Sequence, residues 1–105
     1  MAPSRTLTRL RDRAIVELAA LPLVTQALIS RLDARHVAQD VTGLLVLVLG
    51  STRIRLPRQV TGPLLEYLEA WRLWGSAGPL FLTRARRRLA RSTIATILKR
   101  SRRWR

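Results

Sequence analysis

The feature that most constrains the fold is a run of six apolar residues, Leu44 to Leu49, set between Gly43 and Gly50. A short apolar run bounded by glycines is typical of a buried β-strand. Residues 53–57 then alternate charged and apolar side chains, which predicts a partner strand with one face in water. The short connection between these two segments predicts an antiparallel hairpin.

Three helices are expected around this hairpin. Residues 8–20 mix apolar and charged side chains, and Pro22 ends or interrupts this helix because proline lacks the amide hydrogen. Residues 25–32 suit a second, shorter helix. From Thr61 the apolar side chains again recur at helical spacing, and Pro63 is well accepted in a first turn. The predicted fold class is therefore α+β, mainly helical with a small antiparallel β-hairpin.

Positive charge is concentrated near the end of the chain. The sequence has 105 residues and a formal net charge of +14, of which +11 lies between Ala70 and Arg105, a stretch without Asp or Glu. Such an imbalance indicates an anionic partner, and nucleic acid is the commonest. We expect a single domain over residues 1–105, with a flexible lead at 1–8 and a basic helical segment at 84–105 that faces DNA. An apolar fraction of 48% excludes a disordered basic tail.

The last helix is expected to begin with Ser92 as its N-cap and to turn Ile94, Ile97, Leu98 and Trp104 inward. An Arg-rich helix with small hydroxyl side chains fits a DNA groove, where it can contact phosphates and base edges. The alternative for each of these cations is a solvated surface. The residues predicted to contact DNA come from the hairpin and the basic end: Arg53, Arg55, Arg84, Arg86, Arg87, Arg88, Arg91, Ser92, Thr93, Thr96, Lys99 and Arg100.

The order of these segments resembles the tyrosine recombinase (phage integrase) family. The segments that resemble its successive catalytic-domain elements are residues 10–18, 32–37, 43–57, 64–68, 79–83 and 89–94. The resemblance implies part of that catalytic-domain fold, with the last helix docked in the major groove. It also implies a role related to DNA integration and site-specific recombination.

The chemistry of that family does not carry over. Where the resemblance implies a catalytic arginine, this chain has Thr25 or, shifted by one, Val24, and near the hairpin lysine it has Ser51. The His-x-x-Arg box and the nucleophilic tyrosine have no counterpart in this sequence, since Tyr67 lies in an earlier helix. We therefore predict no catalytic residues and expect that this chain alone does not cleave DNA.

Metal and cofactor chemistry is also not expected. The sequence has no cysteine and one histidine, His36, which suits a surface or half-buried position better than a metal site. The six carboxylates are scattered, and Asp12 is placed to pair with a neighbouring arginine. The start of the chain is charged rather than apolar, so it does not predict a signal peptide. A cytoplasmic, nucleoid-associated protein is the expectation.

Three hypotheses for function remain open. The first is a DNA-binding, recombinase-like module that has double-stranded DNA as its partner and does not cleave it. The second is one part of an interrupted recombinase, with an intact recombinase or a missing C-terminal half as a further partner. The third is a general RNA- or ribosome-associated basic protein.

All three exclude a membrane partner and a small-molecule substrate. The longest apolar run has six residues, against about 20 for a spanning helix.

Overall fold

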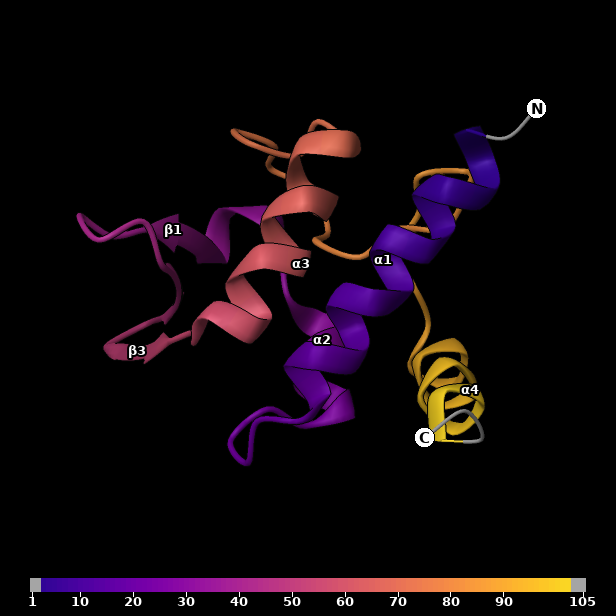
Figure 1. The fold of residues 1–105 in the computed structure, drawn as a ribbon, viewed down its shortest axis with the longest axis horizontal. Helices are drawn as coiled ribbons and strands as arrows, with labels where there is room; N and C mark the ends of the chain where they lie inside the picture. Colours follow the sequence, from indigo (N-terminus) through magenta and orange to yellow (C-terminus); the bar gives the residue numbers. More distant parts are fainter. Residues whose placement is uncertain (1–2, 103–105) are drawn as a thin grey trace.

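The computed structural model describes residues 3–102 (Figure 1). The elements follow in the order α1 Pro3–Ala19, α2 Gln26–Arg31, the short 3₁₀ helix η1 Ala34–His36, β1 Val37–Gln39, β2 Leu45–Leu49, β3 Thr52–Arg55, α3 Arg58–Ala70 and α4 Arg91–Arg102. The predicted α+β class, mainly helical with a small antiparallel sheet, is confirmed. None of the helices within residues 3–102 is long and apolar enough to cross a membrane.

The sheet has three antiparallel strands in the order β1-β2-β3. At its centre Leu47 pairs with Val37 on one side and with Ile54 on the other. Gly50 and Ser51 form the turn of the predicted hairpin, and Gly50 has a φ of 61°, which glycine adopts without strain. Strand β1 was not predicted, because its three residues are too few for an alternating pattern. Pairing with β2 holds it in place.

Helix α3 begins at Arg58, three residues before the predicted start at Thr61. Pro63 therefore lies inside the helix rather than in its first turn. The Thr61 hydroxyl donates to the Leu56 carbonyl oxygen and accepts a hydrogen bond from the Leu45 amide, each at 3.1 Å. This buried side chain joins the start of the helix to β2, which explains a helical turn that the sequence pattern alone does not indicate.

Helix α1 also begins earlier than predicted. Residues 3–8 are helical, so the flexible lead expected at 1–8 is corrected over the part that the structure describes. Pro3 is compatible with this start because the first residue of a helix needs no amide hydrogen. The helix ends at Ala19, ahead of Pro22, as the sequence indicates.

Tyr67 is at the centre of the hydrophobic core, where it is fully buried. Its ring centroid lies 5.3 Å from those of Trp71 and Phe81. Its hydroxyl donates to the Leu80 carbonyl oxygen at 2.7 Å and accepts from the Leu82 amide at 3.2 Å. Burial raises the pKa of Tyr67 above its ordinary value. The tyrosine hydroxyl is therefore committed to the core and is closed to a phosphate from solvent.

Candidate nucleic-acid interface

Helix α4 packs against α1 and α2 and has one buried face (Figure 1). It begins at Arg91, so Ser92 lies inside the first turn and the prediction that Ser92 is the N-cap is wrong. The helix buries Ile94, Ile97 and Leu98 as predicted. The prediction for Trp104 lies outside the described residues. The face opposite the buried residues carries a row of exposed side chains at i, i+4 and i+7: Ser92, Thr96 and Lys99.

Cations flank this row. Arg91 and Arg100 are exposed, as is Lys99, and within residues 3–102 no hydrogen bond or ion pair holds these three side chains. The Thr96 hydroxyl donates to the Ser92 carbonyl oxygen at 3.1 Å, which leaves its lone pairs available as acceptors. The outward face of α4 therefore combines cations with small hydroxyl side chains, and its chemistry suits a polyanion.

The segment before α4 is a closed loop, so the helical prediction for 84–105 is wrong over residues 84–90. A β-bridge joins Leu82 to Arg88, the Thr83 amide donates to the Arg87 carbonyl oxygen at 2.8 Å, and the Arg86 amide donates to the Thr83 carbonyl oxygen at 2.9 Å. Arg86 has a φ of 61°, in the left-handed region. These hydrogen bonds reverse the chain within six residues, which a helix cannot do. We call residues 83–88 the arginine loop.

Arg88 ties the arginine loop to the end of α2. Its Nη1 donates to the carbonyl oxygens of Ser30 at 3.0 Å and Leu32 at 3.3 Å, and its Nη2 pairs with Asp33. The hydrogen bond from Arg88 is the main reason why the pKa of Asp33 lies below its ordinary value. The guanidinium of Arg88 therefore serves the fold, and it is less accessible to DNA than the sequence predicts.

Arg86 is held in a similar way. Its Nη2 donates to the Trp71 carbonyl oxygen at 3.2 Å, and its guanidinium lies 5.9 Å from the centre of the Trp71 ring, within range of a cation–π contact. The side chains of Arg84 and Arg87 are exposed, and within residues 3–102 no hydrogen bond or ion pair engages them. Two of the four arginines predicted to contact DNA in this loop are thus structural.

The hairpin cations do not join the patch on α4. Arg53 and Arg55 are exposed on β3, and the Arg55 Nε lies 3.4 Å from Asp40 Oδ2. The pKa of Asp40 is lowered, chiefly by the hydrogen bond from Thr42. Figure 1 places the hairpin and α4 at opposite ends of the longest axis of the molecule, which measures 36 Å. The predicted DNA-binding residues therefore form separate patches.

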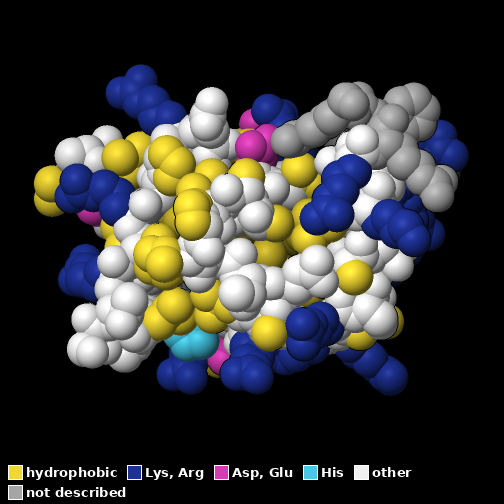
Figure 2. All heavy atoms as spheres, turned by 90° about the horizontal axis from the view of Figure 1, so that it is seen from below, with side chains coloured by type: hydrophobic (Ala, Val, Ile, Leu, Met, Phe, Trp, Pro, Cys, Tyr) yellow, Lys and Arg dark blue, Asp and Glu magenta, His cyan; other side chains and the backbone are white. Residues whose placement is uncertain are grey.

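The surface view shows how widely the basic side chains are distributed. Figure 2 shows Lys and Arg side chains at the left, right and lower edges of one face and within its right half, with apolar side chains towards its centre and left and few carboxylates. Positive charge is therefore widespread, and what distinguishes α4 is the combination of unengaged cations with a row of small hydroxyl side chains.

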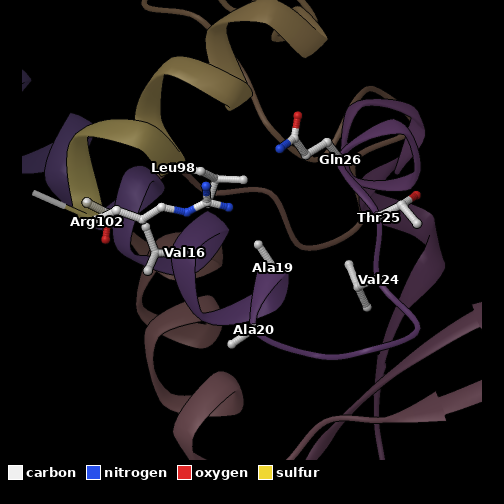
Figure 3. A pocket seen from close by; sticks show the side chains of 9 residues that line it. Val16, Ala19, Ala20, Val24, Thr25, Gln26, Leu98 and Arg102 are labelled. Atoms are coloured by element: carbon white, nitrogen blue, oxygen red, sulfur yellow. The ribbon is translucent and has the colours of Figure 1, made fainter. Parts of the chain in front are cut away.

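The residues at the catalytic positions of the recombinase resemblance serve the fold. Thr25 is the N-cap of α2, where its hydroxyl accepts a hydrogen bond from the Leu28 amide at 3.1 Å, and Val24 is buried. Both line a pocket of about 340 Å³ between the ends of α1 and α4 and the start of α2 (Figure 3). Arg102 is the one cation in its lining among the described residues. Ser51 lies in the exposed hairpin turn.

Arg11 is a structural cation that sequence reasoning missed. It is 8% exposed, and its Nη1 donates to the Leu82 carbonyl oxygen at 3.1 Å. Its Nε donates to Asp12 at 2.9 Å, which confirms that Asp12 pairs with a neighbouring arginine. Helical spacing places Arg11 on the same face as the buried Ala14 and Leu18, and this spacing is the signal that could have identified it.

No metal site is assembled in the described part of the chain. His36 is half-buried, as predicted, and its Nδ1 accepts a hydrogen bond from the Asp33 amide at 3.0 Å. Residues 3–102 contain no group of three or more His, Cys, Asp or Glu side chains that could hold a metal ion. The imidazole therefore braces the 3₁₀ turn in which it lies.

No protein-family model, no curated protein and no solved structure matches this chain. The resemblance to tyrosine recombinases stays a prediction from the sequence. A functional proposal therefore depends on the geometry of the chain's own residues.

Proposed function

We propose that this protein binds double-stranded DNA through the outward face of α4. The observation that carries the proposal is the row Ser92, Thr96 and Lys99, which lies opposite the buried face of the helix and is flanked by Arg91 and Arg100. On a solvated helix face, helix propensity favours Ala, Lys, Arg, Gln or Glu over Ser and Thr. Small side chains at the centre of a face allow the helix backbone to approach another surface closely.

The dimensions of DNA suit this face. The major groove is about 12 Å wide and admits an α-helix. Small hydroxyl side chains in the first two turns would let the helix backbone approach the base edges, and the cations would contact phosphates on either side. Lys99 and Arg100 also lie in the last turn, where positive charge is favourable for the helix itself. Helix stability therefore accounts for part of their placement, whereas it does not account for Arg91 at the first position.

The proposal includes a relation to DNA integration and site-specific recombination without cleavage. Its support is the order of the elements, in which a long helix, a short helix, a hairpin and a further helix precede the basic helix. The buried Tyr67 hydroxyl and the capping role of Thr25 argue that this chain alone does not attack a phosphodiester. In the interrupted-recombinase form of the hypothesis, another polypeptide supplies the nucleophile.

RNA is the second candidate partner, because any phosphate backbone would attract the same cations. The outward row of α4 favours DNA over double-stranded RNA. The major groove of A-form RNA is deep and narrow, so side chains cannot read it. A helix with a small-residue row has more to gain from the wider groove of B-form DNA.

A competition experiment tests this choice. The fluorescence anisotropy of a labelled DNA duplex is measured with the protein while unlabelled duplex DNA or a structured RNA hairpin is added. We expect the duplex to displace the label at lower concentration than the RNA. A clear preference for RNA would overturn the proposal and favour the RNA- or ribosome-associated alternative.

The same assay tests α4 directly. The variant R91Q/K99Q/R100Q should weaken binding and reduce the slope of log K against log salt by about 0.9 for each phosphate that is no longer neutralised. The matched control is R31Q/R58Q/R72N, which removes the same charge from three exposed positions outside α4. Asparagine is used at position 72 because Arg72 has a φ of 54°, which Asn tolerates. Equal slopes in the two variants would place the DNA surface elsewhere.

A further inference from the structure

A second row of arginines lies on α1. Arg5, Arg9 and Arg13 follow at i, i+4 and i+8, and all three side chains are exposed. Arg9 lies opposite the buried Ala14 and Leu18, so the row occupies the solvent face of the helix. Within residues 3–102 no hydrogen bond or ion pair engages these three side chains.

This placement opposes the stability of the helix. Arg5 lies in the first turn, which holds no acidic residue, and a cation there is unfavourable next to the positive end of the helix dipole. Like charges at i and i+4 also destabilise a helix, and this row contains two such pairs. The cations of α4 differ, because Lys99, Arg100 and Arg102 occupy a last turn that favours positive charge. Helix stability therefore gives no reason for Arg5, whereas Arg9 and Arg13 have acidic residues, Asp12 and Glu17, at i+3 and i+4.

The row on α1 continues towards α4. Arg13 and Arg100 line the same pocket of about 170 Å³, and the rest of its lining is Asp12 and Val16 of α1 and Ile97 and Ser101 of α4. The Asp12 carboxylate is paired with Arg11. The two helices contact each other, so the last arginine of the row and the C-terminal half of α4 lie on adjoining surface. Arg5 and Arg13 are about 12 Å apart along the helix axis at 1.5 Å per residue. Measured along the DNA axis, that length corresponds to between three and four base-pair steps, since each strand has one phosphate for about 3.4 Å of axis.

We propose that Arg5, Arg9 and Arg13 form a second line of phosphate contacts, along which the backbone of a DNA duplex held by α4 continues over α1. The inference rests on the proposed function and extends it, because the DNA-binding surface then spans α4 and α1. We call the row Arg5, Arg9 and Arg13 the α1 track. The arginines of this track would contact phosphates, so they add affinity and salt dependence and no preference for sequence.

The salt dependence of binding to a labelled DNA duplex tests this inference. The variant R5Q/R9Q/R13Q is compared with the wild-type chain and with R31Q/R58Q/R72N, which has the same net charge. We expect the slope for the α1 variant to fall by about 0.9 for each arginine, about 2.7 in all, and the slope for the control to change much less. The preference between two duplex sequences should stay the same.

The outcomes separate the two proposals. If the α1 variant behaves as the control does while R91Q/K99Q/R100Q shows a reduced slope, the α1 track is overturned and the α4 site stands. If the wild-type chain does not bind the duplex, the proposed function is wrong, and the proposal for α1, which depends on it, is wrong as well. Loss of fold is excluded by thermal unfolding. The α1 variant should melt at the wild-type temperature or above it, because the substitutions remove like-charge repulsion.

Discussion

Helix α4 and the arginine loop adjoin in the sequence and are both rich in arginine, yet their cations have different roles. On α4, Arg91, Lys99 and Arg100 face solvent and make no hydrogen bond or ion pair with the described part of the protein. In the loop, Arg86 and Arg88 donate to backbone carbonyl oxygens and hold the loop against the ends of α3 and α2. The density of positive charge along a chain therefore does not identify a binding surface. The partners of each guanidinium show which cations are engaged within the fold and which are available to a ligand.

The largest loss of stability should come from Arg88→Gln, and this loss should distinguish the arginine loop from α4. The substitution removes hydrogen bonds to two carbonyl oxygens and the ion pair with Asp33. We expect the unfolding free energy to fall by about 1–2 kcal/mol, at the lower end for charged hydrogen bonds because the side chain is 44% exposed. Chemical denaturation measures this change. The control is Lys99→Gln, which should leave stability within about 0.5 kcal/mol of the wild type. Equal losses of stability in the two variants would show that Arg88 in the loop is no more important to the fold than Lys99 on α4.

A smaller loss is expected for Arg86→Gln. This change removes one hydrogen bond to the Trp71 carbonyl oxygen and the cation–π contact with the Trp71 ring. Together they should contribute about 1 kcal/mol or less, because the guanidinium lies at the outer limit of the range for a cation–π contact. Thermal unfolding monitored by Trp fluorescence reports both the stability and the surroundings of the ring. A variant with unchanged stability and unchanged fluorescence would show that Arg86 is free to bind DNA after all.

The smallest effect on stability should come from Asp33 and should depend on pH. The folded-state pKa of Asp33 is lowered below 3.8, so its pairing stabilises the protein above that pH and the stabilisation is lost as pH falls through the folded pKa. The wild type should therefore be more stable than Asp33→Asn at pH 7, and the two melting temperatures should converge below about pH 3.8. The difference should be less than for Arg88→Gln, because Arg88 keeps its two carbonyl partners. A constant difference between the two proteins down to the lowest pH would contradict this role for Asp33.

Much of the fold could be predicted from the sequence, because its local signals agree with its packing. The glycine-bounded apolar run indicates the central strand, and the spacing of Ile94, Ile97 and Leu98 indicates the buried face of α4. The features that were not predicted arise from long-range contacts. Strand β1 exists through pairing with β2, and the early start of α3 depends on Thr61 bonding to Leu45.

The candidate site was harder to predict for the same reason. A run of arginines looks the same in the sequence whether its guanidinium groups meet water or carbonyl oxygens. Ser30 and Leu32, which accept from Arg88, lie more than 50 residues away in the chain. The left-handed φ of Arg86 turns the chain out of a helix, and no residue such as Gly or Asn marks that turn in the sequence. By contrast, the i, i+4, i+8 spacing of Arg5, Arg9 and Arg13 was present in the sequence and becomes meaningful once α1 is known to begin at Pro3.

The central claim is that the outward face of α4 meets DNA, and an amide ¹H–¹⁵N chemical-shift titration of the full chain with a DNA duplex tests it most directly. We expect the largest shifts at the exposed positions of the helix: Ser92, Thr93, Thr96, Lys99 and Arg100. The amides of the opposite end of the molecule, around the hairpin turn at Ser51, should move least. Shifts confined to the hairpin, with α4 unchanged, would contradict the claim, and so would shifts spread evenly over every exposed arginine of the chain.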